Sequence, residues 1–481
     1  MPFMDLNTVN YLKKNETKSP DLTGLLLYIN LDARESYMSE NKKILDEEKI
    51  NLADATRVKY FDIVIDHGQG AIISDADGNE YIDLLASASA TNIGHSHPKV
   101  VAAISNQAKK LIQYTPAYFA NPVTALLAKR LVDITPGNFQ KQVAFGNSGS
   151  DANDAIIKFA RGYTHRSYVV SFTGAYHGST YGSISISGVS LNMTRKIGPL
   201  LPNTIKVPFP DQNQRAVGES DDDFSDRLFK QFKLPFETYL PADEVALVII
   251  EPIQGDGGII KVPQKYMSLV YEFTREHGIV FAVDEVNQGL GRTGKMWSID
   301  HFGIAPDMMS IGKSLASGLP LSAVVGRKEI MSSLSAPANV YTTAGNPVTA
   351  AAAMATLDVL AEENLVARSE KLGELARDFF EQAAHSYWFI GDVRIYGLNG
   401  GIDIVDEKGQ PDNQATTKLI YRIFQLGAIM ISLRGNTLRF QPPLVITEAQ
   451  LSQAFKILTQ AFNELEAGTL SLPETDNHIG W

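Results

Sequence analysis

The sequence predicts an α/β protein whose larger domain holds a mainly parallel sheet covered by helices on both faces. Between about Gly94 and Gly326, short apolar runs alternate with longer segments of helical periodicity. This alternation is typical of parallel strands joined by crossover helices. A chain of 481 residues is also too long for one hydrophobic core, so more than one domain is expected.

The predicted elements fall into four consecutive segments. Residues 1–50 are polar and charge-dense and predict an N-terminal extension. Residues 51–93 alternate apolar and polar positions around an Asp-Gly-Asn turn, which predicts a hairpin and the N-terminal part of a small domain. Residues 94–346 form the predicted large domain. Residues 347–481 supply an alanine-rich linking helix and the C-terminal part of the small domain.

Five short apolar runs in the large domain predict buried strands. They are Gln142–Phe145, Ser167–Phe172, Val245–Ile250, Ile279–Val283 and Asp307–Ile311. In a sheet of this kind, ligand sites gather beyond the carboxyl ends of the strands. The segment 211–237 is acidic and polar and predicts a surface insertion.

The composition disfavours several classes of function. The formal net charge of −11 argues against binding to nucleic acid or to an anionic membrane, which requires an excess of basic residues. The chain has no cysteine, so it has neither disulfides nor thiolate metal sites. No apolar run approaches the ~18 residues of a membrane span. The polar N-terminus lacks the features of a secretory signal, and a cytoplasmic location is expected.

The first segment with chemical potential is 147–153, which follows a predicted strand and precedes a predicted helix. Small residues at such a turn let backbone N–H groups approach an anion, and the helix dipole favours its charge. Asp151 or Asn153 could instead be a plain N-cap. The segment alone therefore predicts phosphate binding and a structural cap equally.

Charged residues follow two later strands. Asp284 and Glu285 close a buried strand, where unpaired carboxylates are costly. A carboxylate there could keep a heterocyclic nitrogen protonated, or belong to a metal site or a structural ion pair. Lys313 follows the next strand beside small residues and could form an imine, although a lone lysine is normally a solvated surface residue. Their positions at the ends of consecutive strands favour functional roles for Asp284 and Lys313.

Two histidines, His95 and His97, lie two positions apart in a predicted turn. This spacing fits no common metal-ligand pattern, so a structural role near the functional site is favoured and no metal is expected.

The order of these segments resembles the class III, ornithine-aminotransferase-like branch of the pyridoxal-phosphate enzymes. The resemblance runs from about Asp66 to the C-terminus through the blocks GHSHP, GNSGSDAND, YHG, IIEPIQGDGG, VDEVNQGLGRTG, SIGKSLASGLPLSAV, TTAGNP and LRFQPP. It implies the fold type I architecture: a large domain with a mainly parallel seven-stranded sheet and a small α+β domain. It also implies pyridoxal 5′-phosphate as the cofactor.

The resemblance assigns roles by position in these blocks. It implies that Lys313 carries the cofactor as a Schiff base and that Asp284 binds its pyridine nitrogen. Further implied contacts are Gly149 and Ser150 with the phosphate, Tyr176, His177 and Asn287 around the ring, Thr342 with the phosphate of a neighbouring subunit, and Arg439 with the substrate α-carboxylate. A homodimer with shared active sites, possibly a tetramer, is therefore expected.

Three positions depart from the usual transaminase pattern. Asn287 stands where the Asp-Glu-Val-Gln-Thr-Gly block has glutamine, so its contact with the ring hydroxyl is in question. Thr343 replaces an aromatic residue, and Asp256 replaces a glutamate. Together with the terminal Ile479-Gly480-Trp481, these departures resemble one subgroup, the branched-chain amino-acid racemases.

That likeness implies inversion at C2 of isoleucine, valine and leucine, with an ω-type aminotransferase as the alternative. A non-catalytic binding protein is disfavoured because Lys313 and Asp284 are both intact. Besides Arg439, only Arg292 stands out as a cation for a distal carboxylate. Non-polar amino acids are therefore expected to react far better than glutamate or ornithine.

Racemisation also needs a proton carrier on the face of Cα opposite Lys313. Asp256, in the glycine-rich loop 255–258, is the candidate. In related transaminases the matching glutamate pairs with the carboxylate-binding arginine while the site is empty. An ion pair between Asp256 and Arg439 and a role as proton carrier are both open.

Overall fold

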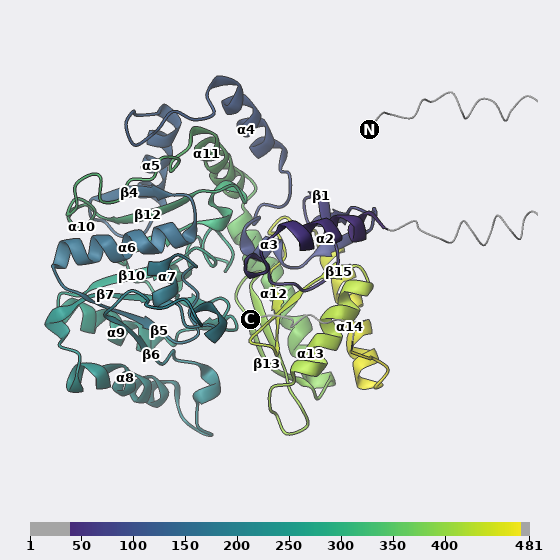
Figure 1. Cartoon of the computed structure of the whole chain (residues 1–481). Coiled ribbons are helices and arrows are strands. Elements are labelled where there is room, and N and C mark those ends of the chain that lie inside the picture. The colour runs from purple at the N-terminus through teal and green to yellow at the C-terminus, as the bar shows by residue number, and fades with distance from the viewer. Residues whose placement is uncertain (1–38, 473–481) are drawn as a thin grey trace, which may run out of the picture.

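The computed structural model describes residues 39–472. Most of the predicted extension at 1–50 and the terminal Ile479-Gly480-Trp481 lie outside the described residues. Figure 1 shows a large sheet with its helices on one side of the molecule and smaller sheets on the other. The consecutive helices α11 (Pro347–Glu362) and α12 (Leu365–Ser386) connect the two parts, and α11 confirms the predicted alanine-rich helix.

The mainly parallel sheet is confirmed, and it has the seven strands that the resemblance implied. β12 is antiparallel to both of its neighbours, β11 and β4. The other neighbouring strands are parallel. All five predicted strands are present, whereas β6 and β12 were not predicted. Across the sheet the order is β4 (Lys141–Gly146), β12 (Ser322–Arg327), β11 (Met308–Ile311), β10 (Val280–Asp284), β7 (Val245–Ile250), β5 (Tyr168–Phe172) and β6 (Thr204–Val207).

Helices cover both faces of this sheet, which explains its unbroken apolar strands. Along β7, Leu247 and Ile249 pack in one core with α6 (Gly149–Thr164). Val248 and Ile250 belong to the core on the opposite face, with α8 (Asp221–Thr238) and α9 (Gln264–Glu276). All six residues of β7 are buried as a result.

The prediction of a surface insertion at 211–237 is wrong, because most of this segment forms α8. Phe224, Leu228 and Phe232 recur every four residues and are buried, as expected for one face of an amphipathic helix. The ring of Phe232 meets Tyr266 of α9 edge-on, with centroids 6.5 Å apart. The acidic run that suggested an insertion is the first turn of the helix, where its dipole favours negative charge.

Two four-stranded sheets form the smaller part. One contains β1 (Ile65–Gln69), β2 (Ile72–Asp75), β3 (Glu80–Asp83) and β15 (Ala428–Ile429), and so joins early and late segments of the chain. The predicted hairpin at the Asp-Gly-Asn turn is its antiparallel β2–β3 pair. The other contains β13 (Ile390–Ile395), β14 (Gly400–Ile404), β17 (Thr437–Phe440) and β16 (Ile431–Leu433).

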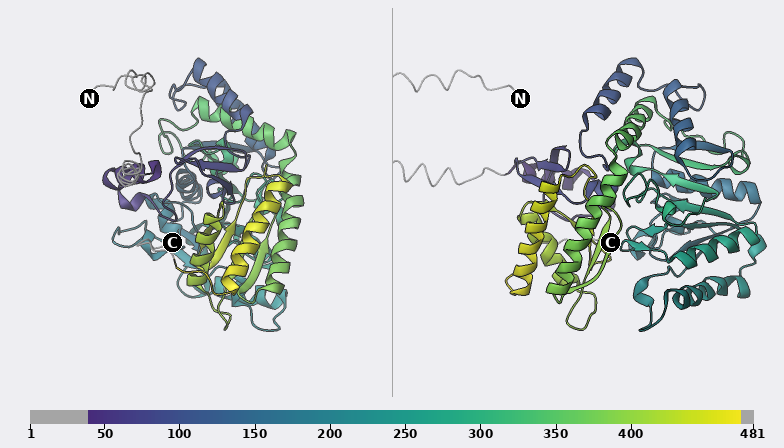
Figure 2. Two further views of the ribbon diagram at one scale, coloured as in Figure 1. Left: turned by 90° about the vertical axis from the view of Figure 1, so that its right-hand side faces the viewer. Right: turned by 180° about the vertical axis from the view of Figure 1, so that it is seen from behind.

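The helices α12, α13 (Asn413–Gln425) and α14 (Glu448–Glu466) pack on the smaller part. Figure 2 shows α12 and α14 side by side on this part. The exact boundaries predicted for the domains stay predictions.

A left-handed turn follows β3, labelled α3 (Ala86–Ser89) in Figure 1. Its four non-glycine residues have φ values between 48° and 66°. Each residue held in this conformation costs roughly 1–2 kcal/mol. The carboxylate of Asp83 stabilises the turn by accepting hydrogen bonds from the backbone N–H groups of Leu85 and Ala86, both at 2.8 Å.

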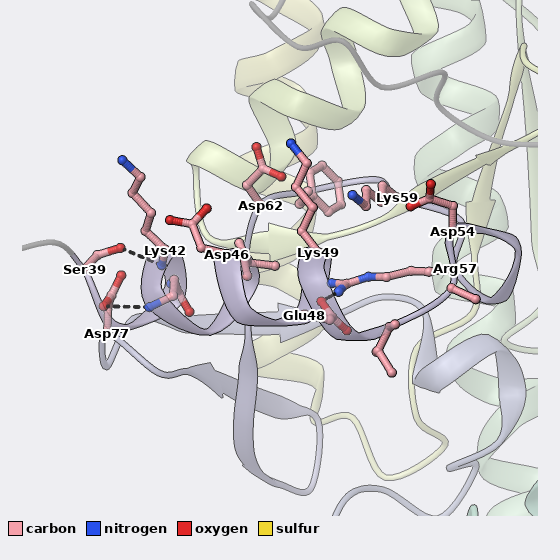
Figure 3. Close-up of a pocket in the computed structure, with 15 residues that line it drawn as sticks. Ser39, Lys42, Asp46, Glu48, Lys49, Asp54, Arg57, Lys59, Asp62 and Asp77 are labelled. Atoms are coloured by element: carbon pink, nitrogen blue, oxygen red, sulfur yellow. Dashed lines mark hydrogen bonds and ion pairs between the residues drawn. The ribbon is translucent and has the colours of Figure 1, made fainter.

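The helix α2 (Glu40–Asn51) lies over a cavity of about 590 Å³ beside the segment 52–62 (Figure 3). Asn41 anchors the helix, since its side chain donates to Asp75 at 3.0 Å and accepts from the backbone N–H of Val64 at 2.9 Å. The cavity is lined by side chains of both charges, and none of the predicted site residues lies in its wall. It is therefore separate from the candidate active site.

Candidate active site

The N-terminus of α6 forms an anion cradle. Ser148 is its N-cap, and Asp151 completes a capping box by accepting hydrogen bonds from the backbone N–H groups of Asn147 and Ser148 at 2.9 and 3.1 Å. Gly149 and Ser150 then open the first turn, where backbone N–H groups have no acceptor within the helix. The N-cap is thus Ser148, and neither Asp151 nor Asn153 takes that position, although Asp151 has a structural role in the capping box. Phosphate binding by the first-turn N–H groups stays a prediction.

The turn that carries Tyr176 and His177 packs directly on this cradle. The backbone N–H of Ser179 donates to the Oγ of Ser150 at 3.0 Å. Gly178 makes this approach possible, since a Cβ there would lie 2.2 Å from the same Oγ.

Asp284 ends β10 in a fully hydrogen-bonded environment. Its Oδ2 accepts from Nδ2 of Asn153 at 2.7 Å and lies 2.8 Å from Nδ1 of His177, while its Oδ1 accepts from the backbone N–H of Val286 at 2.9 Å. Burial raises the pKa of Asp284, but these hydrogen bonds and the charge of His177 outweigh it, so the pKa lies below its ordinary value. The site therefore presents an ionised carboxylate at the end of a buried strand.

The neighbouring Glu285 has a different role. It accepts hydrogen bonds from the backbone N–H groups of Ser298 and Ile299 at 2.9 and 2.8 Å. Burial raises its pKa to about 8 despite these bonds. Glu285 is thus a structural contact with the segment that follows the GRTG turn.

Lys313 follows β11 and Gly312 in a left-handed conformation, with φ of 45°. Such a backbone conformation in a non-glycine residue is strained and is common at functional sites. Burial lowers the pKa of its ammonium, the nearby Asp256 raises it, and Arg439 lowers it again, with a net reduction. With its carboxamide oxygen turned toward these cations, Asn287 accepts from Nζ of Lys313 at 2.7 Å and from Nη2 of Arg439 at 2.8 Å.

The structure therefore gives Asn287 a contact set that the resemblance did not suggest. The sequence left its contact with the ring hydroxyl in question, and the structure places Asn287 between Lys313 and Arg439.

Arg439 lies on β17, and Asp256 lies in the loop between β8 (Ile253–Gln254) and β9 (Ile260–Lys261). Nη1 of Arg439 is 3.0 Å from Oδ1 of Asp256, and both side chains are buried. The ion pair that the sequence left open is therefore present in this state.

Two contacts in the site were not predicted as such. Glu251 is buried at the end of β7 and accepts from the backbone N–H groups of Tyr176 and Gly255 at 3.0 and 2.9 Å, so it fixes the loops that carry Tyr176 and Asp256. Burial, with the charge of Asp284, raises its pKa. Asn153, considered only as a cap, holds Asp284 instead. Glu251 could have been identified from the sequence by the same signal as Asp284, because both carboxylates lie at the end of an apolar strand.

Four further residues singled out in the sequence have contacts that the structure also shows. His177 lies behind Asp284 with its side chain fully buried. His95 pairs with Asp83 at 2.7 Å, and His97 caps α4 (Pro98–Lys110). The side chain of Thr342 is exposed, while its carbonyl accepts from Gln113 at 2.9 Å.

The donor and acceptor set fits pyridoxal phosphate. A helix N-terminus suits the dianionic phosphate, an ionised carboxylate suits a protonated pyridine nitrogen, and a lysine with a lowered pKa suits linkage to an aldehyde. Across the described residues, no group of three or more carboxylate or imidazole side chains could hold a metal ion. The fold and this site define a pyridoxal-phosphate-dependent enzyme of fold type I.

Comparison with known proteins identifies the family. The profile of the family "Aminotransferase class-III" matches residues 53–462. The chain is 58% identical to isoleucine 2-epimerase of Lentilactobacillus buchneri, over 92% of this chain and 99% of that protein. It is 41% identical to a leucine/methionine racemase of Thermococcus litoralis, over 89% and 96%. The solved ornithine aminotransferase of Toxoplasma gondii superposes with a TM-score of 0.78 at 26% identity, covering 94% of this chain and 100% of that one.

The chain belongs to the class-III aminotransferase family, and its cofactor is pyridoxal 5′-phosphate.

Proposed function

We propose that this protein is an amino-acid racemase that inverts C2 of non-polar amino acids, converting L-isoleucine to D-allo-isoleucine and also acting on valine and leucine. The observation that carries the proposal is the 58% identity to isoleucine 2-epimerase over nearly the whole of both chains. The racemase from Thermococcus litoralis supports the same reaction class.

The cation set supports non-polar substrates. Arg292, the one other arginine considered for a distal carboxylate, is fully buried. Its Nη1 donates to the carbonyls of Leu398 and Pro442 at 2.8 and 2.5 Å, and its Nη2 donates to Asn92 at 2.7 Å. A guanidinium committed to these acceptors cannot also bind a second carboxylate of glutamate.

The bound cofactor supplies an electron sink for the charge left at Cα when its proton is removed. Arg439 binds the substrate α-carboxylate, and Lys313 carries the proton on one face of Cα. Asp284, which stays ionised, keeps the pyridine nitrogen protonated. Gly149 and Ser150 bind the phosphate, and Tyr176 and Asn287 border the ring, with His177 supporting Asp284 from behind.

Asp256 is the proposed proton carrier on the opposite face. Its carboxylate is close enough to raise the pKa of Lys313, and it is paired with Arg439. A substrate carboxylate that binds Arg439 competes for the same guanidinium edge and releases Asp256. The ion pair and the proton carrier are then two states of one residue, before and after the substrate enters.

A homodimer with shared active sites is the proposed assembly. Leu111, Ile112, Tyr114, Tyr118 and Phe119 form a run of exposed apolar side chains. Gln113, within this run, holds the segment of Thr342, the residue proposed to bind the partner's phosphate. Hybrids of Lys313→Ala and Thr342→Ala chains, compared with each parent, would test whether sites are shared.

A cytoplasmic location is also proposed. Within residues 39–472, no helix has both the length and the apolarity needed to cross a membrane.

The deciding experiment incubates the holoenzyme with L-isoleucine without any keto acid and separates the products by chiral chromatography. Catalytic formation of D-allo-isoleucine supports the racemase. An ω-type aminotransferase would stop after converting its cofactor once, and sustained turnover only after addition of a keto acid would overturn the proposal.

A further inference from the structure

A chain of buried carboxamides leads away from the carboxylate-binding arginine. Nε of Arg439 donates to Oε1 of Gln441 at 2.7 Å. Nε2 of Gln441 donates to Oδ1 of Asn399 at 2.5 Å, and Nδ2 of Asn399 donates to Oε1 of Gln288 at 2.7 Å. The side chains of all three amides are completely buried, in a region where unpaired polar groups are costly.

The chain has a fixed direction because a guanidinium only donates hydrogen bonds. Arg439 therefore requires the oxygen of Gln441 on its Nε side, which turns the amino group of Gln441 toward the oxygen of Asn399. The same constraint then turns the amino group of Asn399 toward Gln288. One orientation of the three amides satisfies the contacts that run from Nε of Arg439 to Gln288, and this chain of contacts restrains the rotation of the guanidinium.

The three amides come from both parts of the molecule. Asn399 precedes β14 and Gln441 follows β17, two neighbouring strands of the smaller part. Gln288 follows β10 of the seven-stranded sheet. Gln288 also stands where the family's Asp-Glu-Val-Gln-Thr-Gly block has threonine, a side chain too short to take the same place in this chain.

Arg292 binds backbone carbonyls next to two of the three amides. The carbonyls that it binds belong to Leu398 and Pro442, the direct neighbours of Asn399 and Gln441. Its Nε donates to the Oγ of Ser89 at 3.1 Å, which ties the same segment to the left-handed turn after β3.

We propose that Gln288, Asn399 and Gln441 are positioning residues that lock the Nε edge of Arg439, so that its two Nη groups remain directed at the substrate α-carboxylate. The proposal rests on the proposed function, because it assumes that Arg439 binds that carboxylate. Nη1 already contacts one carboxylate, that of Asp256, so this edge of the guanidinium is accessible to a carboxylate. A bidentate pair needs both Nη groups in one plane with the carboxylate, and free rotation of the guanidinium would weaken it.

The test measures binding of 3-methylbutanoate, which has the carboxylate but no amine, to the holoenzyme by titration calorimetry. Gln441→Met removes the contact with Arg439 at nearly the same volume, and Gln288→Thr removes the far end of the chain. We expect the Kd to rise about tenfold or more in Gln441→Met, since a buried hydrogen bond to a charged group is lost, and by a smaller factor in Gln288→Thr. In turnover, KM should rise more than kcat falls.

Two controls separate this effect from general damage. Asn436→Ala removes another buried amide of the same part, which donates to the carbonyl of Ile404 at 3.2 Å, and should leave the Kd unchanged. Binding of 2-methylpropylamine, which lacks a carboxylate, should be the same in all variants.

The proposal is overturned if Arg439→Leu abolishes binding of 3-methylbutanoate while Gln441→Met and Gln288→Thr bind it like the parent enzyme. It is also overturned if amine and carboxylate binding weaken together. Absence of D-allo-isoleucine with the parent enzyme would instead contradict the proposed function, since the Kd measurements require no turnover.

Discussion

Oδ1 of Asp256 lies 3.0 Å from Nη1 of Arg439 in a buried ion pair. The contact joins the proposed proton carrier to the residue proposed to bind the substrate carboxylate. In the proposed function, occupation of Arg439 by substrate and release of Asp256 are therefore linked events. The role of Asp256 in proton transfer can be measured separately from proton removal by Lys313.

Asp256→Ala should collapse racemisation by about 100-fold or more, because general acid–base catalysis by one group contributes about that factor. Washout of α-deuterium from one enantiomer should survive, since Lys313 still removes that proton. Both rates are measured by mass spectrometry and chiral chromatography from each enantiomer. Asp256→Glu, which restores the family's residue, should retain part of the racemisation. A modest and equal loss of both rates in Asp256→Ala would make Asp256 a positioning residue.

Lys313→Ala should abolish turnover and the visible absorbance of the lysine-linked cofactor. The amine is the group that forms the linkage, and alanine provides no substitute. Lys328→Ala, at an exposed lysine beyond β12, is the matched control and should keep both properties. Retention of the lysine-linked spectrum by Lys313→Ala would place the cofactor on a different residue.

Asp284→Asn should lower the rate by at least about 100-fold, since one preorganised charge contact is worth ~3 kcal/mol or more. The shape of the side chain is nearly unchanged, and its contacts with Asn153 and Val286 can persist in part. Rates are compared at equal cofactor content, determined after release of the cofactor in alkali. A near-normal rate would show that Asp284 does not act by protonating the ring.

The pH dependence of cofactor attachment should report the charges around Lys313. The free amine reacts, and its pKa lies below the ordinary value of 10.5, so the apoenzyme should take up pyridoxal phosphate with a midpoint below that pH. Asp256 raises this pKa and Arg439 lowers it. Asp256→Asn should therefore move the midpoint to lower pH, and Arg439→Gln should move it to higher pH. Stopped-flow absorbance over a pH series measures both shifts, and equal midpoints in all three proteins would contradict this electrostatic coupling.

Non-polar amino acids should be turned over at least about tenfold better, in kcat/KM, than glutamate or ornithine. Arg292 is committed to carbonyl and amide acceptors, so it is not free to bind a distal carboxylate, which would lose a charge-assisted hydrogen bond. The comparison uses a panel of isoleucine, valine, leucine, glutamate and ornithine. A preference for an acidic or dibasic substrate would contradict the proposed substrate class.

The large sheet was predictable because its strands are continuous apolar runs, and β10 ends at Asp284, the carboxylate that the sequence placed there. The amphipathic helix α8 was missed because its acidic first turn hides the four-residue spacing of Phe224, Leu228 and Phe232. β6 and β12 were missed as well. Local pattern is weak in a strand as short as the four residues of β6, or where polar residues cap an element.

The members of the site were predictable where a motif fixed them, as at Lys313 and Asp284. The partners of those residues were not, because contacts such as Asn153 with Asp284 join positions 131 residues apart. The same holds for the amides around Arg439, since Gln288 and Gln441 come together only when both parts of the molecule are folded. A single sequence carries no signal for such long-range pairs.

The sheet that joins β3 to β15 has a consequence for synthesis of the protein. β3 ends at Asp83, and its parallel neighbour β15 begins at Ala428. A ribosome adds about 5–20 residues per second, so β3 waits tens of seconds for that neighbour. During this time one edge of the β1–β2–β3 hairpins exposes unpaired backbone groups, which are a template for pairing with other nascent chains. This enzyme should therefore depend on chaperones late in translation, and C-terminally truncated chains should aggregate rather than accumulate as folded fragments.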